Sequence, residues 1–573
     1  MTSVIIYTII FLIPIAVWWC RFKPMTLPGI PSWSDDHLVW GDLPRLKKIL
    51  RDNGSFTDFL DLSSKTLGPI CQIRLGPFAH MVIITDYQEI ESLLLRRHSS
   101  LDRSSQTTSL FKTILPRALL TLQTGDVWRK HRKGIGTAMT PRFLALTMSN
   151  ITKSAQNLVE LWNRKGELSG GRSWEAEVDL ESAMMDAICG LAFGESWNVI
   201  TSYTGQLESL NSDIGNDLSN IGSRGEIVFH LNAPDPARTT WYIFQAVPVE
   251  SPFPALSHFF TRLTPSYRYH TKRMDDFLEQ RLAEARHKAS NLSCEMASEA
   301  ADNTFDLLIA KQLGEGGLSD DEIKQELFQY LLAGTETSST TLAWISRTSF
   351  HNKFLQLISQ KWCKFMTNNP AIQRKLRQHL LNRLPQDIIH NMTFDDLIAV
   401  NLPYLEAVVH ETLRMARTAG GFLRDTKEDM CIMGHHIPKG TTLAFPTSIG
   451  HQDLSSPDYL LSTSLSHAEE RRVGYWKSGT GHVFDPERWL TEDGQFNAIA
   501  GPSLPFSLGQ RRCFGKNLAL LELRIFIAHL SLSFFFARIP ADQNSFDRFD
   551  KVISHPKDCF VRPVQWTSEE ASC

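Results

Sequence analysis

Cysteine is scarce in this chain, which has nine in 573 residues and none at the C-x-x-C spacing. A disulfide framework needs a denser, paired set, and a zinc ribbon or thioredoxin-type site needs two cysteines close together in sequence. The sequence therefore argues against all three and favours a reducing compartment.

The positive and negative charges of the chain nearly balance. Lys and Arg number 59 against 62 Asp and Glu, which gives a net charge of -3, and no long block of like charge occurs. Nothing in this balance suggests a nucleic-acid partner. The chain has no internal repeat or low-complexity tract, and its 42% hydrophobic content excludes wholesale disorder.

One long hydrophobic run lies at the N-terminus. Residues 4–20 carry no charge, and they would form about 26 Å of helix, close to the minimum for a bilayer core of about 30 Å. No basic residue precedes the run and no A-x-A-like site follows it, which argues against the alternative of a cleaved signal peptide. Trp18 and Trp19 lie where aromatic residues gather at the membrane–water interface. The positive charges of Arg21 and Lys23 favour an orientation in which the C-terminal end of the membrane helix faces the cytosol.

The sequence divides into three parts. We expect a membrane anchor at residues 1–23, a proline-rich hinge at 24–40 and one large body at 41–573. Alternating and β-branched residues at 71–85 predict a β-hairpin, whereas most of the body has helical periodicity. The pattern predicts a mainly α fold with a minor β subdomain, preceded by one transmembrane helix.

Two helices are predicted in some detail. Ser319 with Glu322 forms a capping-box start, and from Ile323 onward the helix is apolar on nearly every side, which is typical of a helix in the middle of a protein. The second helix carries one apolar stripe, made by Leu405, Val408, Val409 and Leu413.

One cysteine has a distinctive setting. Residues 506–515 read FSLGQRRCFG, and a strongly helical run follows at 517–530. A helix N-terminus and the neighbouring Arg511 and Arg512 favour thiolate over thiol at Cys513, and a thiolate in an apolar loop suits an axial haem ligand. The alternative is that Cys513 is a small buried hydrophobe, which is the ordinary fate of a lone cysteine.

This ten-residue stretch resembles the haem-binding loop of the cytochrome P-450 superfamily, pattern F-x-x-G-x-R-x-C-x-G, with every fixed position matched. The resemblance implies the cytochrome P-450 fold and haem b as cofactor. It implies that Cys513 is the axial ligand of the haem iron, that Arg511 pairs with a haem propionate and that Phe506 belongs to the cofactor-binding loop. A buried carboxylate needs such a charge-assisted partner.

Two further segments resemble the family's structural network. Glu411 and Arg414 lie three apart in an E-T-L-R stretch, a spacing that alone is usually surface decoration. With Arg488 in the downstream F-D-P-E-R-W segment, the resemblance implies a buried Glu411–Arg414–Arg488 network that locks the loop around Cys513.

The segment AGTETS at 333–338 lies inside the apolar helix. One interpretation is a tolerated kink, with Thr337 bonded back to the preceding turn. The other is the family's oxygen-activation motif: the resemblance implies that Gly334 opens a groove over the iron, while Thr337 and Glu336 relay protons to bound dioxygen.

Three more residues are similar to the family's propionate contacts. Trp128 and Arg132 lie four apart on a predicted helix, and Arg424 precedes the turn at 437–440. The basic residues beside them, Arg129, Lys130 and Lys133, are predicted to lie on the surface of this helix, where their charge would suit docking of an acidic electron donor.

The chain departs from the family pattern in three places. Residues of about 345–360 and 460–475 have no counterpart, and insertions of this size inside compact domains are uncommon. We hypothesise that one or both are unspliced intron sequence, which transcript reads running through both segments would refute. Arg417 also stands where the family commonly has proline.

The resemblance implies a monooxygenase that hydroxylates or epoxidises a lipophilic small molecule, similar to fungal enzymes that modify terpenoid or polyketide secondary metabolites. Electrons would come from NADPH through a separate cytochrome P-450 reductase. With the anchor, we expect a single-pass endoplasmic reticulum membrane protein whose catalytic domain is cytosolic. The alternatives are a haem-thiolate isomerase or dehydratase that does not use dioxygen, an inactive haem protein if the insertions disrupt the site, and, most remotely, a helical binding module.

Overall fold

The computed structural model describes residues 26–33, 40–52, 54–76, 80–209, 217–248, 251, 254–314, 317–343, 362–385, 392, 394–451, 472–477, 479–544, 548–550, 553–556 and 558–567. The predicted anchor, the segment at 345–360 and most of the segment at 460–475 lie outside these residues. Within them, every helix is too short or too polar to cross a membrane.

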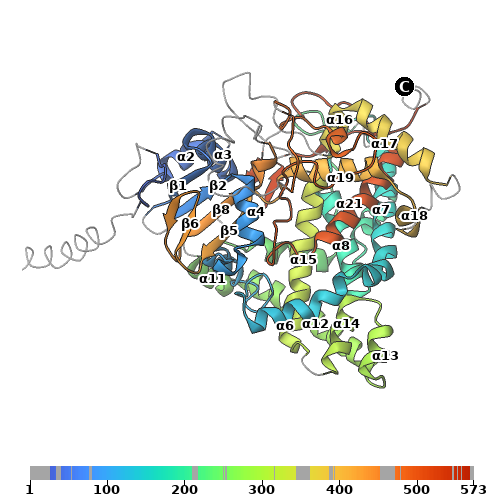
Figure 1. Ribbon diagram of the computed structural model, residues 1–573. Coiled ribbons are helices and arrows are strands. Elements are labelled where there is room, and N and C mark those ends of the chain that lie inside the picture. The colour runs from blue at the N-terminus through green and yellow to red at the C-terminus, as the bar shows by residue number, and fades with distance from the viewer. Residues whose placement is uncertain are drawn as a thin grey trace, which may run out of the picture.

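Helices make up most of the described chain (Figure 1). The first half contains α2 (Leu43–Arg51), α3 (Phe56–Leu67), α4 (Tyr87–Leu95), α5 (Ser105–Phe111), α6 (Asp126–Gly136), α7 (Pro141–Leu168), α8 (Glu177–Phe193), α9 (Val199–Glu208), α10 (Asp235–Gln245), α11 (Pro254–Leu263) and α12 (Pro265–Ala289). The second half contains α13 (Cys294–Glu299), α14 (Thr304–Gln312), α15 (Asp320–Ala343), α16 (Trp362–Asn368), α17 (Pro370–Arg383), α18 (Phe394–Ala399), α19 (Pro403–Ala416) and α21 (Lys516–Ser533).

A five-stranded sheet lies at one side of the helical body (Figure 1). Its strands follow the order β1 (Ile70–Arg74), β2 (His80–Ile84), β8 (Thr442–Pro446), β5 (Gly421–Thr426) and β3 (Leu101–Arg103). The smaller sheets pair β6 (Met430–Ile432) with β7 (His435–Ile437), β12 (Phe560–Val561) with β4 (Trp174–Glu175), β13 (Pro563–Gln565) with β9 (Phe534–Phe536), and β10 (Arg548–Asp550) with β11 (Ser554–Pro556).

The predicted hairpin is confirmed, because β1 and β2 pair antiparallel with Ile70 opposite Ile84. Alternation along β2 explains why the sheet is covered on both faces. Met81 and Ile83 pack with Phe59 of α3, whereas Val82 and Ile84 pack with Ile90 of α4. The predicted mainly α fold with a minor β part is confirmed as well.

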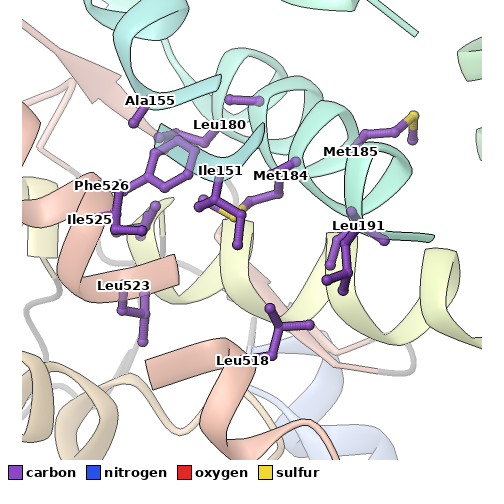
Figure 2. Packing of buried hydrophobic residues seen from close by; sticks show 14 of the residues in the cluster. Ile151, Ala155, Leu180, Met184, Met185, Leu191, Leu518, Leu523, Ile525 and Phe526 are labelled. Atoms are coloured by element: carbon purple, nitrogen blue, oxygen red, sulfur yellow. The ribbon is translucent and has the colours of Figure 1, made fainter. Parts of the chain in front are cut away.

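The largest core cluster joins α7, α8, α15 and α21. Figure 2 shows part of it, with Ile151 of α7, Met184 of α8 and Phe526 of α21 among the packed side chains. The helix α15 runs through the middle of the body, as its all-round apolar character predicted (Figure 1). Its predicted capping box is present: the Ser319 N–H donates to Glu322 Oε2 at 2.8 Å, and the Glu322 N–H donates to Ser319 Oγ at 3.3 Å.

Candidate active site

A cavity of about 390 Å³ lies between α15, α6 and the segment that precedes α21. Most of the predicted site residues line it, although they are far apart in sequence. Those residues are Trp128, Arg132, Gly334, Thr337, Arg414, Arg424, Phe506, Arg511 and Cys513. Glu336, Glu411 and Arg488 do not line it.

Cys513 lies in a tight loop that ends at the start of α21. Its N–H donates to the Phe506 carbonyl at 2.8 Å, which closes the loop. The turn depends on Gly509, whose φ is +72° and where an added Cβ would lie 2.0 Å from the Leu94 carbonyl oxygen. No other residue type fits there, so the glycine fixes the position of Cys513 relative to α4.

The expectation that Cys513 favours thiolate is wrong for the protein chain alone. Desolvation by the surrounding protein atoms raises the pKa of the Cys513 thiol, although the thiol faces the cavity, and the Gly515 N–H, Arg132 and Arg103 oppose this only in part. The neighbouring cations and the helix terminus are visible in the sequence, whereas desolvation is not. A bound metal ion would favour the thiolate, because it deprotonates a ligating thiol.

Seven of the described arginines line the same cavity, and four of them, Arg103, Arg132, Arg424 and Arg511, are candidates for binding an anionic ligand. Burial, followed by repulsion from neighbouring arginines, lowers the pKa of Arg103 to about 9 and that of Arg424 to about 10. The Nη1 of Arg511 and the Nε of Arg103 are buried without a hydrogen-bond partner. Such a surplus of buried positive charge fits a ligand that carries carboxylates.

Arg511 is held in place by the polypeptide around it. It donates through Nε to Thr124 Oγ1 at 2.9 Å and through Nη2 to the Leu122 carbonyl at 2.7 Å, and Nη2 lies 3.1 Å from Asp102 Oδ1. Its guanidinium lies 4.4 Å from the centre of the Trp128 ring. Asp102 and Arg103 were missed in the sequence, because they belong to a three-residue strand with no periodic pattern and no motif.

The middle of α15 forms another wall of the cavity. Ala333, Gly334 and Thr337 line the cavity, whereas Glu336 does not. The Thr337 hydroxyl donates to the Ala333 carbonyl at 2.5 Å, so its back-bonded conformation is the one observed. An added Cβ at Gly334 would lie 2.5 Å from Ile188 Cδ1, so any larger residue there would force the Ile188 side chain of α8 to move.

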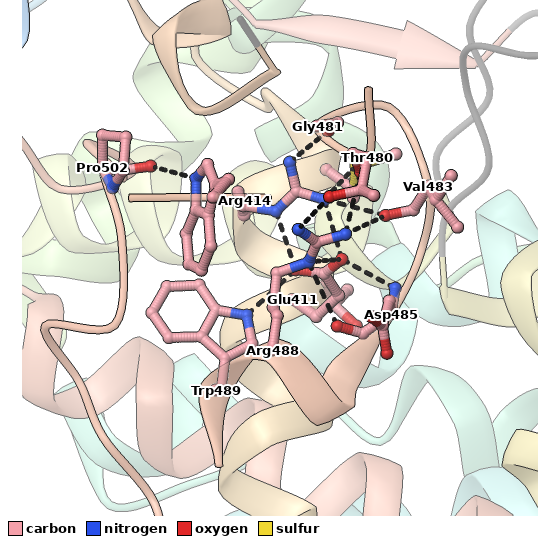
Figure 3. Close-up of polar contacts among 12 residues, drawn as sticks. Glu411, Arg414, Thr480, Gly481, Val483, Asp485, Arg488, Trp489 and Pro502 are labelled. Atoms are coloured by element: carbon pink, nitrogen blue, oxygen red, sulfur yellow. Dashed lines mark hydrogen bonds and ion pairs between the residues drawn. The ribbon is translucent and has the colours of Figure 1, made fainter. Parts of the chain in front are cut away.

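Glu411 is the centre of a buried network (Figure 3). It accepts from Arg414 Nε and Nη2, each at 2.7 Å, and from Arg488 Nε at 3.1 Å. The N–H groups of Trp489, at 2.9 Å, and Asp485, at 2.8 Å, complete its partners. Burial would raise the pKa of Glu411, but Arg414 and Arg488 outweigh it and hold the pKa below its ordinary value.

The network reaches the Cys513 loop through one tryptophan. Arg414 and Arg488 lie over the ring of Trp476, at 5.6 Å and 5.2 Å from its centre. The Trp476 Nε1–H donates to the Pro502 carbonyl at 3.0 Å, four residues before Phe506. Trp476 and Trp489 could not be assigned from sequence, since their roles depend on segments brought together only by the fold.

Comparison with known proteins identifies the family to which the chain belongs. A model of the family described as Cytochrome P450 matches residues 31–346, 361–455 and 475–561. The chain belongs to the cytochrome P450 family. The two interruptions of this match, 347–360 and 456–474, overlap the segments that depart from the family pattern; their origin as intron sequence stays a prediction.

Fungal cytochrome P450 monooxygenases are among the relatives that the chain matches over nearly its whole length. A P450 monooxygenase of Pestalotiopsis microspora is 28% identical over 94% of each chain, and TRI13 of Fusarium sporotrichioides is 28% identical over 95% of each. The P450 monooxygenase xilC of Penicillium rubens is 26% identical over 91% of this chain and 89% of its own. The protein is a P450 monooxygenase, a family that uses haem iron.

Haem fits the residues of this P450 cavity. Among the described residues, Cys513 is the cysteine whose thiol faces the cavity and would bind the haem iron, and Arg103 and Arg511 offer unpartnered donors for propionates.

The structure also explains why the chain tolerates Arg417 where the family commonly has proline. Arg417 adopts φ +48°, a value closed to proline, and its Nη2 lies 2.6 Å from Asp61 Oδ2.

Proposed function

We propose that this P450 hydroxylates or epoxidises a lipophilic small molecule, a terpenoid or polyketide secondary metabolite, with electrons from a separate NADPH-dependent reductase. The observation that carries the proposal is one cavity that Cys513, several arginines and a larger set of apolar side chains line together. Leu119, Leu120, Ile188 and Phe422 supply much of that apolar wall. An apolar wall favours a lipophilic substrate, which it would desolvate and hold.

Haem b, when bound, would supply the activation of dioxygen and the transfer of one oxygen atom to the substrate. Cys513 would supply the sulfur that binds the haem iron. Arg511, Arg424, Arg103 and Arg132 would hold the two propionates, since each guanidinium offers several donors in a fixed plane.

The proton supply is assigned to α15. The Thr337 hydroxyl would turn from the Ala333 carbonyl to hold a water at the cavity wall, and Glu336 would pass protons to it from solvent. Glu336 lies outside the cavity lining, which is consistent with a solvent-side position in such a relay.

The cellular setting follows from the sequence at the N-terminus. Residues 4–20 would anchor the chain as a single pass in the endoplasmic reticulum membrane, with Arg21 and Lys23 on the cytosolic side. The exposed side chains of Arg129, Lys130 and Lys133 on α6 would give an acidic reductase a basic surface to contact.

The test is reconstitution of the full-length protein with haem, an NADPH-dependent P450 reductase and a panel of terpenoids and polyketides. We expect dioxygen consumption that depends on the panel compound, with one oxygen atom from labelled dioxygen in the product. Product formed without dioxygen would instead support a haem-thiolate isomerase or dehydratase, which no relative named above favours.

A further inference from the structure

The segment between α5 and α6 forms a wall of the cavity but has little structure of its own. Residues 112–125 contain no helix or strand. Leu119 and Leu120 of this segment nevertheless line the cavity. A chain segment without secondary structure leaves backbone N–H groups that need partners elsewhere.

Three side chains of α15 supply those partners. Gln325 Oε1 accepts from the Arg117 N–H, Glu326 Oε1 from the Leu119 N–H and Gln329 Oε1 from the Leu120 N–H, each at 2.7 Å. Gln329 lies four residues after Gln325 and three after Glu326, so it neighbours both and the three acceptors share one side of the helix. We name residues 117–120 the wall loop and these three side chains the acceptor row.

The acceptor row also connects to α6. Glu326 and His131 are both fully buried, and His131 Nδ1 lies 2.6 Å from Glu326 Oε1. Because α6 carries Trp128 and Arg132 of the cavity, Glu326 joins three of its walls: α15, the wall loop and α6.

The far end of the same segment is tied down independently. The Thr124 N–H donates to Asp102 Oδ2 at 3.0 Å, and its hydroxyl donates to Asp102 Oδ1 at 2.7 Å. Opening the wall loop therefore requires breaking the bonds of the acceptor row, while the end beside Arg511 stays in place.

We propose that Gln329 and Glu326 are positioning residues that hold the wall loop against α15 and thereby limit the size of the ligand that reaches the centre of the cavity. They act through the backbone of Leu119 and Leu120, not through the chemistry at Cys513. This proposal deepens the proposed function, on which it rests, because it concerns how bulky substrates are admitted.

The first experiment measures hydrogen exchange of peptides from residues 115–124 in the full-length haem-loaded protein. Gln329→Met keeps the side-chain length but removes the acceptor, so we expect exchange at Leu120 to become about tenfold faster, the effect of losing one backbone hydrogen bond. Gln325→Met is the control, since Gln325 and Arg117 lie outside the cavity lining; Gln329 itself lines the cavity, so exchange at Leu120 is the measurement that isolates its hydrogen bond to the wall loop. Gln325→Met should speed exchange at Arg117 alone.

The second experiment mixes the protein rapidly with each of two haem ligands, imidazole and the bulkier 4-phenylimidazole, and measures the binding rate from the Soret shift. Gln329→Met should bind 4-phenylimidazole several-fold faster than the wild type and imidazole at an unchanged rate, whereas Gln325→Met should change neither. Glu326→Leu should show the same selectivity, and Glu326→Gln, which keeps an acceptor oxygen, should restore wild-type rates.

Unchanged exchange at Leu120 in Gln329→Met would overturn the proposal, and so would equal changes for both ligands. If Glu326→Leu loses haem, Gln329→Met still decides, because Gln329 is neutral and its replacement leaves His131 its partner. A wild type without a haem signal would refute the proposed function instead, since the exchange measurement on the wall loop can still be made on the chain itself.

Discussion

Glu411→Gln tests whether the buried network stabilises the fold through charge. Glu411 Oε2 accepts from Arg414 Nε and Trp489 Nε1, and Oε1 accepts from Arg414 Nη2, Arg488 Nε and the Asp485 N–H. An amide nitrogen in either place would face at least two donors. The change also leaves two buried guanidinium groups without their carboxylate, so we expect a loss of about 3–5 kcal/mol in the free energy of unfolding.

Urea unfolding of the haem-loaded protein, with the wild type alongside, measures this loss. Glu406→Gln on the same helix is the matched control, because the ion pair of Glu406 with Arg524 is partly exposed. Its removal should cost roughly 0–1 kcal/mol. If Glu411→Gln costs no more than Glu406→Gln, the reasoning about the network is wrong.

Three other substitutions give distinct outcomes. Thr337→Ala should keep haem but divert electrons to hydrogen peroxide, which a peroxide assay against substrate turnover measures; coupling equal to wild type would count against the proton relay. Glu522 has a pKa raised by burial to about 8, opposed by its hydrogen bond from Ser338, so the folded chain keeps a proton that the unfolded chain loses above its ordinary pKa. Wild-type stability should therefore fall between about pH 4.5 and pH 8, while Glu522→Gln lacks this component and should gain relative to wild type across that window in urea midpoints. Arg417→Pro should destabilise the protein by about 3 kcal/mol or more, since proline cannot adopt φ +48° and the Asp61 ion pair is lost; an unchanged midpoint would show that the backbone there is free to move.

Sequence reasoning worked where the pattern was local. The apolar residues around α15 placed that helix in the centre, and the alternation at 71–85 gave the hairpin. The ten residues around Cys513 carried enough fixed positions to indicate a haem loop. In each case the informative residues lie within one short segment of the chain.

Features that depend on contacts between distant segments of the chain could not be predicted from the sequence. The acceptor row meets the wall loop across more than 200 residues of sequence, as the Glu326–Leu119 separation of 207 shows. Arg103 and Asp102 sit in a strand too short to have a period. The pKa of Cys513 follows from burial in the folded chain, which the neighbouring residues in sequence do not report.

The reduced, carbon-monoxide-bound difference spectrum of the wild type beside Cys513→Ala tests the central claim most directly. The wild type should show the strongly red-shifted Soret band of a thiolate-ligated haem, because Cys513 is the thiol that lines the cavity among the described residues. Cys513→Ala should lose that band. A red-shifted band that survives in Cys513→Ala, or a histidine-type band in the wild type, would contradict the assignment of the haem ligand.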